Sequence, residues 1–178
     1  MAENLTLLVV SDIHGNSANL ARVLARQIKK PDALLFLGDG YSDVNRAEPL
    51  YMPLFAVRGN CDVWSVMGVT ELTRDLTVTL GGYKIFMTHG HAYINSGGVD
   101  AIAARGAREG ADVVLYGHTH VRHEAHYAAG DIVGGVKLEK ALHVFNPGSL
   151  GSPRDEKAPS FGVIEIRENG ILFSHGEV

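Results

Sequence analysis

The stretch "LTLLVVSDIHGNSANLARVLARQIKKPDALLFLGD", residues 5–39, decides the fold of this chain. It opens with six apolar or β-branched residues, 5–10, a run typical of a strand buried on both faces. Residues 16–30 carry apolar side chains at helical spacing, and Pro31 ends the helix. A second apolar run follows at 32–39. A strand, a helix and a strand in this order predict a parallel pair with a right-handed crossover.

The rest of the chain continues this pattern. We expect buried strands at 53–60, 111–117 and 142–149, a helix at 98–110, and hairpins at 76–90 and 161–175 that turn at Gly81-Gly82 and Asn169-Gly170. The glycine-rich segment 128–140 fits either a loop or a poor strand. No repeat or linker divides residues 1–178, which predicts one α/β domain whose later half is richer in antiparallel strands.

Composition excludes several classes of protein. The chain has 178 residues, enough for one hydrophobic core, and a formal net charge of −4, which offers no basic surface for nucleic acid. Its one cysteine, Cys61, excludes an internal disulfide and fits a reducing cytosol. The start of the chain lacks a basic region, and no apolar run approaches the roughly 20 residues of a membrane span. We therefore expect a cytoplasmic protein without a membrane partner.

Almost every predicted strand ends in a polar cluster beside a glycine. These clusters read "SDIHGN", "LGDG", "RGNCD", "THGH", "YGHTH" and "FNPGS". Open α/β sheets bind ligands at the carboxyl ends of their strands, so the clusters should gather on one rim. His118 and His120 lie two residues apart and face the same side of an extended chain. Turns routinely use Asp and Asn but do not explain paired histidines, so metal binding is the better interpretation.

Seven of these side chains form the predicted ligand set: Asp12, His14, Asp39, Asn60, His89, His118 and His120. Carboxylate, imidazole and amide donors favour Mn, Fe, Co, Ni or Zn. Seven ligands are too many for one catalytic ion with an open position. Two ions about 3.5–4 Å apart, sharing a carboxylate, would use them all and suit phosphoryl displacement. We therefore expect two divalent ions per chain, Mn2+ first, with Ni2+, Fe2+, Co2+ or Zn2+ as alternatives.

The motifs "DIH", "GD", "GNCD", "THGH" and "GHTH", in this order over residues 12–120, resemble the pattern of the calcineurin-like metallophosphoesterases. The "NPGS" at 146–149 and the short length resemble the family's small bacterial and archaeal branch. The resemblance implies an α/β fold in the form of a four-layer α/β/β/α sandwich, with two mixed sheets flanked by helices. It also implies metal-dependent hydrolysis of phosphate esters, here of a small phosphodiester.

The resemblance also implies how the seven ligands divide. One metal would be held by Asp12, His14 and His120. The other would be held by Asn60, His89 and His118, and Asp39 would bridge the two metals. A hydroxide bridging the two metals would be the nucleophile, and Asn60 would also touch the phosphate. Asp62 would orient the centre. His91 is either a catalytic, substrate-facing residue or a solvated loop residue.

One position departs from the family pattern. Many members have a histidine where this chain has Cys61, a poorer proton donor to the leaving group, so good leaving groups should be favoured. The expected substrate contacts are Asn60, Cys61, Arg58 and Asn146, although an ion pair for Arg58 and a plain turn at "NPGS" are alternatives. Tyr41 and Trp64 either line the cleft or pack in the core. Four other histidines are expected to be ordinary surface or partly buried residues: His123, His126, His143 and His175.

Two other functions share these motifs. A eukaryotic trafficking subunit has this family's fold but works as a protein-binding scaffold with altered catalytic positions, whereas every ligand position here holds a competent residue. A nuclease acting on DNA is the second alternative, and the acidic balance and the lack of an accessory domain count against it. The family also suggests a homodimer or tetramer, but no segment indicates the interface.

Overall fold

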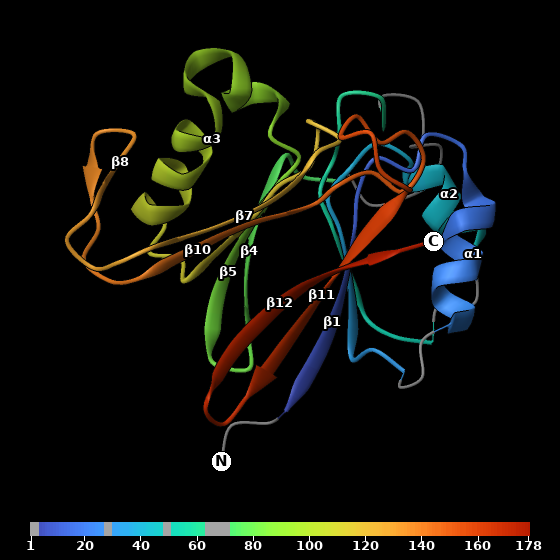
Figure 1. Ribbon diagram of the computed structural model, residues 1–178, viewed down its shortest axis with the longest axis horizontal. Helices are drawn as coiled ribbons and strands as arrows, with labels where there is room; N and C mark the ends of the chain where they lie inside the picture. Colours follow the sequence, from blue (N-terminus) through green and yellow to red (C-terminus); the bar gives the residue numbers. More distant parts are fainter. Residues whose placement is uncertain (1–3, 27–29, 48–50, 63–71) are drawn as a thin grey trace.

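The computed structural model describes residues 4–26, 30–47, 51–62 and 72–178, which form two five-stranded sheets (Figure 1). The first sheet has the order β12-β11-β1-β2-β3: β1 Leu5–Val10, β2 Ala33–Phe36, β3 Leu54–Ala56, β11 Ser160–Arg167 and β12 Gly170–Glu177. The second has the order β4-β5-β6-β10-β7: β4 Asp75–Leu80, β5 Tyr83–Thr88, β6 Val113–Leu115, β7 Arg122–Tyr127 and β10 Leu142–Pro147. Both sheets contain parallel and antiparallel pairs, so both are mixed.

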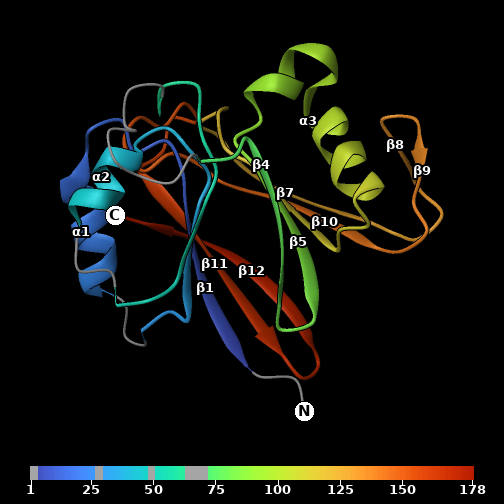
Figure 2. The ribbon, with the colours of Figure 1, turned by 180° about the vertical axis from the view of Figure 1, so that it is seen from behind.

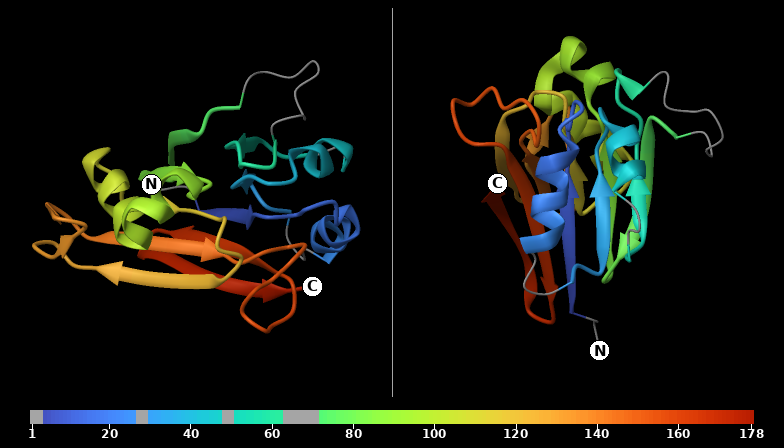
Figure 3. Two further views of the ribbon diagram at one scale, coloured as in Figure 1. Left: turned by 90° about the horizontal axis from the view of Figure 1, so that it is seen from above. Right: turned by 90° about the vertical axis from the view of Figure 1, so that its right-hand side faces the viewer.

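Helices cover the outer faces of both sheets. α1 (Ser17–Arg26) and α2 (Tyr41–Arg46) pack on the first sheet, and α3 (His91–Arg108) packs on the second. Figure 3 shows the resulting layers from above and from the side, with the two sheets between the helices. The predicted four-layer α/β/β/α sandwich is therefore confirmed. None of the helices in the described part of the chain is long and apolar enough to cross a membrane.

The apolar run in β1 follows from its position in the middle of a sheet. Leu7 and Val9 face the core between the two sheets, whereas Leu8 and Val10 face the core beneath α1. All four side chains are buried, because successive residues of a strand point to opposite faces and both faces of β1 are covered. Burying each such side chain contributes roughly 1.5–3 kcal/mol, which explains why the sequence shows no alternation here.

The predicted pairing of the strands is largely confirmed. β1 and β2 are parallel neighbours, and β4 and β5 form the expected hairpin. Gly81 and Gly82 both have positive φ, as the tight turn of such a hairpin requires. The closing hairpin turns one residue earlier than predicted, because Arg167 pairs directly with Gly170.

Several elements differ from the sequence-based prediction. The helix predicted at 98–110 begins at His91, and non-helical Gly97 and Gly98 interrupt it. α2 and β7 were not predicted. The segment 128–140 contains a two-stranded ladder of β8 (Ile132–Val133) and β9 (Val136–Lys137), which stands beside α3 in Figure 2. Strands β2, β3 and β6 are shorter than expected because the chain leaves each sheet early to form the polar loops.

Candidate metal centre

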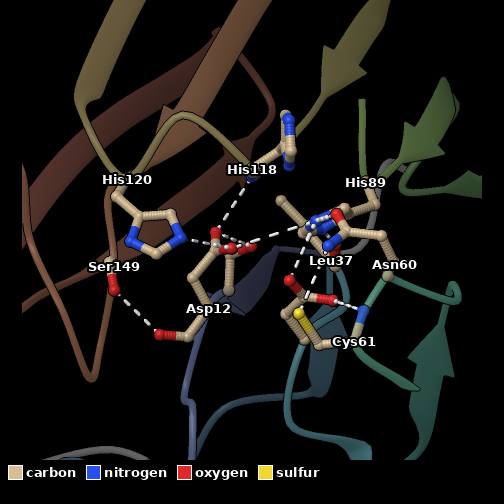
Figure 4. A network of polar contacts seen from close by, with 12 residues as sticks. Asp12, Leu37, Asn60, Cys61, His89, His118, His120 and Ser149 are labelled. Atoms are coloured by element: carbon tan, nitrogen blue, oxygen red, sulfur yellow. Dashed lines mark hydrogen bonds and ion pairs between the residues drawn. The ribbon is translucent and has the colours of Figure 1, made fainter. Parts of the chain in front are cut away.

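The polar clusters that follow the strands lie together at one end of the sandwich. β1, β2 and β3 are parallel in the first sheet, and β5, β6 and β10 are parallel in the second. The carboxyl ends of these strands therefore lie at the same end of each sheet, which is where open α/β sheets bind ligands. Figure 4 shows Asp12 and His120 on one side of a common centre and Asn60 and His89 on the other.

Backbone conformation sets this edge apart from the rest of the molecule. Six non-glycine residues in the described chain have a positive φ, and five are predicted ligands: Asp12 (54°), His14 (47°), Asp39 (62°), His118 (66°) and His120 (61°). Such a conformation is uncommon for residues with a side chain. It costs on the order of 1–3 kcal/mol per residue and is concentrated at functional sites.

The first group of donors is formed by Asp12, His14 and His120. The Nε2 atoms of His14 and His120 are 3.2 Å apart, and they lie 3.8 Å and 3.2 Å from Oδ1 of Asp12. His120 Nδ1 donates a hydrogen bond of 2.6 Å to the carbonyl of Ser152. This bond fixes the ring so that Nε2 faces the carboxylates, the orientation that metal-binding histidines require.

The second group is formed by Asp39, His89 and Asn60. His89 Nδ1 donates to the carbonyl of Leu37 at 2.7 Å, which leaves Nε2 facing the centre. This Nε2 atom lies 3.4 Å from Oδ2 of Asp39 and 3.2 Å from Oδ1 of Asn60. His89 is buried and Asn60 is exposed, so the group extends from the core to the surface.

The carboxylate of Asp39 faces both groups. Its Oδ2 lies 3.8 Å from His14 Nε2 as well as 3.4 Å from His89 Nε2. Its Oδ1 accepts a hydrogen bond of 2.7 Å from the backbone N–H of Cys61. Burial raises the pKa of Asp39, but the hydrogen bond and charge of His89 and the N–H of Cys61 outweigh burial and hold this pKa well below its usual range. Asp39 is therefore an anion that faces both donor groups.

One buried oxygen at the centre indicates that the donors fit a cation. Oδ1 of Asp12 is buried and has no hydrogen-bond partner in the described structure. It faces the Nε2 atoms of three histidines: His120 at 3.2 Å, His14 at 3.8 Å and His89 at 4.0 Å. A buried carboxylate oxygen without a partner is costly, and a divalent ion among these donors would satisfy it. Three overlapping sets of donor atoms, each within 4.8 Å of one another, are close enough to hold an ion: Asp12, His14 and His120; Asp12, Asp39 and His89; and His14, Asp39 and Cys61.

His118 and His91 lie beside the second group without joining it. The ring centre of His118 is 5.1 Å from that of His89, and that of His91 is 5.4 Å away. No nitrogen of His118 belongs to any of the three compact sets of donors, and Figure 4 shows its ring standing off the carboxylates. Burial and the positive charge of His89 lower the pKa of both rings. His118 reaches the second group only by rotation of its side chain.

Asp62 lies behind the centre and holds its loops. Its buried carboxylate accepts four backbone N–H groups at 2.8–2.9 Å: Asp39, Gly40, Tyr41 and Gly59. These donors belong to the loops that follow β2 and β3, so one carboxylate joins the two loops that carry Asp39 and Asn60. The orienting role expected for Asp62 stays a prediction.

Close packing explains the glycine of the "GHTH" motif. A Cβ at Gly117 would lie 2.0 Å from Ser11 Oγ and 2.9 Å from Asp12 Oδ2. That same Oδ2 accepts hydrogen bonds from the Ser11 hydroxyl and from the N–H of His118. Only glycine lets the loop after β6 approach Asp12 this closely.

Cys61 lies on the rim as an exposed free thiol. Partial burial of the thiol, together with its hydrogen bond to Asp39 and the negative charge of that carboxylate, raises the pKa of Cys61 to about 11. Its Sγ accepts a hydrogen bond of 3.2 Å from the amide of Asn60. The thiol is thus protonated at neutral pH and lies next to both donor groups, where the sequence placed a substrate contact.

The other expected substrate contacts occupy different positions. Arg58 is exposed and forms no ion pair in the part of the chain that is described, so the ion-pair alternative is not observed. Asn146 is fully buried, and its amide donates to the carbonyl of Gly117 and the hydroxyl of Thr119. This burial gives Asn146 a positioning role behind the "GHTH" loop instead of a substrate contact.

Two residues that support the centre were not singled out from the sequence. Ser149 donates its hydroxyl to the carbonyl of Asp12, and the carbonyl of Ser152 orients His120. The "NPGS" motif was the only sequence signal for Ser149, and it also fits a turn. Tyr41 is buried against Phe36 in the core beneath α2, which confirms its packing alternative. Trp64 lies outside the described residues.

A four-layer sandwich that gathers histidine, aspartate and asparagine donors in two groups about a shared carboxylate has the architecture of a metal-dependent hydrolase. Residues 5–169 match the calcineurin-like phosphoesterase superfamily domain, and the chain belongs to this family. The resemblance inferred from the motifs is therefore confirmed.

Similar proteins agree with this assignment. The probable metallophosphoesterase YsnB of Bacillus subtilis (strain 168) is 28% identical over 165 residues, which cover 93% of this chain and 86% of YsnB. A predicted phosphoesterase from Streptococcus pneumoniae TIGR4 is similar in structure, with a TM-score of 0.72, 28% identity, and coverage of 98% of this chain and 90% of that one. A Vps29 mutant from Entamoeba histolytica shares the fold, with a TM-score of 0.67, 22% identity, and coverage of 98% and 99%.

Proposed function

We propose that this chain is a phosphodiesterase that hydrolyses small phosphodiesters at a dinuclear metal centre. One observation carries the proposal: Asp39 Oδ2 lies within 3.8 Å of His14 Nε2 in the first donor group and within 3.4 Å of His89 Nε2 in the second. A carboxylate shared in this way suits two cations about 3.5–4 Å apart, the separation used in phosphoryl displacement.

Each residue of the centre has a defined task in this proposal. When bound, two divalent cations supply an activated water and neutralise charge on the phosphate. The first cation would be held by Asp12, His14 and His120, the second by Asn60, His89 and His118, and both by Asp39. Asn60 is exposed, and its amide nitrogen would donate to a phosphate oxygen. Leu37 and Ser152 keep two imidazoles oriented through their carbonyls.

The exposed residues around the candidate centre favour a diester with a good leaving group as the substrate. His14, Asn60 and Cys61 are exposed, which leaves room for the second ester group of a diester. Cys61 stands where a histidine would protonate the leaving oxygen, and a thiol is a weaker donor for that purpose. Substrates whose leaving group departs without a proton should therefore react fastest. Mn2+ is the proposed ion, since carboxylate, amide and imidazole donors all suit it.

The test is hydrolysis by metal-stripped protein after addition of Mn2+, Ni2+, Co2+, Fe2+, Zn2+ or Mg2+. Bis-p-nitrophenyl phosphate is the diester and p-nitrophenyl phosphate the monoester. We expect metal-restored activity that is higher on the diester and falls about 100-fold or more in His118→Ala. His126→Ala, which removes an exposed histidine of β7 outside the centre, is the control and should keep full activity.

A protein-binding scaffold is the competing function, because Vps29 structures share this fold. A scaffold needs neither donor group nor the left-handed backbone at five ligand positions. Protein that binds no divalent metal and cleaves neither ester would favour the scaffold. Protein that binds two ions but cleaves neither ester would instead indicate a narrower substrate.

A further inference from the structure

Two histidines far from the metal centre face each other on neighbouring strands. His126 on β7 pairs in register with His143 on β10, and their Nδ1 atoms are 3.3 Å apart. The ring centres are 4.5 Å apart, with an angle of 46° between the planes. His126 is exposed and His143 is partly buried, so the pair is accessible from solvent.

The separation of these nitrogens matches that of two ligands on one ion. At metal–nitrogen distances of about 2.0–2.1 Å, two ligand nitrogens lie roughly 3.3–3.4 Å apart on a tetrahedral ion such as Zn2+ and about 2.9 Å apart at neighbouring positions of a square-planar or octahedral ion such as Cu2+ or Ni2+. A proton shared between the rings would also bring the nitrogens close together, and a divalent ion would replace that proton. The pair therefore needs little rearrangement to chelate a metal.

The surroundings hold the pair in this geometry. The ring of Phe173, from β12 of the other sheet, stacks on His143 with centres 5.1 Å apart and an angle of 29°. The antiparallel pairing of β7 with β10 fixes the two backbones. Burial and the neighbouring His126 lower the pKa of His143, although Glu124 and Asp112 act in the opposite direction, and a lowered pKa favours the neutral ring that binds metals. Such preorganisation lowers the entropic cost of binding.

This position is separate from the candidate metal centre. His126 lies six positions after His120 in the chain, a span of up to about 20 Å in extended conformation. Figure 2 shows β7 and β10 running away from the loops of the centre toward the β8–β9 hairpin. His126 and His143 lie near that far end, since β7 ends at Tyr127 and β10 begins at Leu142.

We propose that His126 and His143 form an additional metal site, which binds one late divalent transition ion: Ni2+, Cu2+ or Zn2+. Among the described residues, no third histidine, cysteine or carboxylate completes the pair, so water would fill the remaining positions. The affinity of such a site for divalent ions increases in the order Mn2+ < Co2+ < Ni2+ < Cu2+, and Mn2+ prefers carboxylate oxygen as a ligand. The additional site therefore takes Ni2+ but not Mn2+.

The proposal predicts a difference in ion count between two metals. Metal-stripped full-length protein is dialysed to equilibrium against Mn2+ or Ni2+, and bound metal is measured by elemental analysis. Wild-type protein should bind one more ion per chain with Ni2+ than with Mn2+. His126→Gln and His143→Gln should each lose this extra ion and keep Mn2+-dependent hydrolysis. The control His123→Gln, which removes a different histidine of β7, should retain it.

Two outcomes would overturn the proposal: equal Ni2+ and Mn2+ counts in wild type, or an extra Ni2+ ion that persists in both variants. Because the variants remove only the pair, a main centre that binds fewer ions of either metal changes the totals but not the loss of one Ni2+ ion between wild type and variant. Cu2+ electron paramagnetic resonance of wild-type protein and of His126→Gln gives a second measure. A two-nitrogen signal that wild-type protein shows and His126→Gln lacks would support the pair, and identical spectra would contradict it.

Discussion

At the scale of single residues, the candidate centre combines backbone strain with a buried oxygen that lacks a partner. Five ligand positions adopt the left-handed conformation, and Asp12 Oδ1 has no hydrogen-bond partner in the described structure. Both features cost stability. Their coincidence at one edge indicates that ligand binding, and not folding alone, shapes this part of the chain.

Asp62 allows a direct test of how the centre is held. Asp62→Asn replaces a charged acceptor of four N–H groups with an amide whose own N–H2 group faces those donors. We expect a loss of about 2–4 kcal/mol in the free energy of unfolding and a 10–100-fold fall in Mn2+ affinity. Urea denaturation of metal-stripped protein and Mn2+ titration measure the two effects. Unchanged metal affinity would show that Asp62 acts only on stability.

Cys61 allows a test of leaving-group chemistry. Cys61→His restores the residue that many family members carry, and general-acid catalysis contributes roughly 10²–10⁴-fold where a proton is needed. We expect at least a tenfold increase in the hydrolysis of aryl diesters with poor leaving groups and little change for p-nitrophenyl esters. The measurement is the dependence of rate on leaving-group pKa. An equal effect on all esters would rule out a role for this position in proton donation.

Local motifs identified the ligand candidates, but residue type alone could not assign the supporting contacts. Asp12, Asp39 and the histidines were found because they follow strands at regular places in the sequence. The supporting roles of Asn146 and Ser149 could not be predicted in this way, because their hydrogen bonds reach residues that lie 29 and 137 positions away in the sequence. Such contacts depend on the packing of the two sheets, which no local pattern records.

At the scale of elements, central strands were predicted and peripheral elements were missed. β1, β2 and β6 are buried on both faces and read as apolar runs. β7 lies at the edge of its sheet, and its sequence "RHEAHY" lacks the apolar residues that mark a strand. The six-residue α2 is too short to show helical periodicity.

Gly106 shows how tertiary packing overrides helix propensity. Alanine is favoured over glycine in a helix by about 1 kcal/mol, yet a Cβ at Gly106 would lie 2.2 Å from Val114 Cγ2 in β6. We expect Gly106→Ala to lower the free energy of unfolding by about 1–3 kcal/mol. In the Val114→Ala background, which removes the clash, the same change should be neutral or stabilising. A double-mutant cycle measures this coupling, and additive effects would contradict it.

At the scale of the whole molecule, the packing of the two sheets brings predicted ligands as far apart in sequence as Asp12 and His120 to one end of the sandwich. The polar loops follow strands from both sheets, so the centre forms only when the sandwich is complete. Ligands assembled in this way are dispersed in the unfolded chain. Metal binding should therefore be coupled to folding.

This coupling predicts metal-dependent stability. Each ion bound at 100 times its dissociation constant adds about 2.7 kcal/mol to the free energy of unfolding. Thermal unfolding with saturating Mn2+ and after metal removal should therefore give clearly different midpoints. Asp39→Asn, which removes the charge of the bridging carboxylate, should lose most of this difference. Equal midpoints for wild-type protein under both conditions would mean that Mn2+ does not bind the folded chain preferentially.

The most direct test of the dinuclear centre is a crystal structure grown with Mn2+, with the ions located by anomalous scattering. We expect two peaks about 3.5–4 Å apart, one among Asp12, His14 and His120 and one beside Asn60 and His89, with Asp39 between them. His118 should have rotated toward the second ion. A single peak, or no peak near Asp39, would contradict the shared carboxylate on which the proposed function rests.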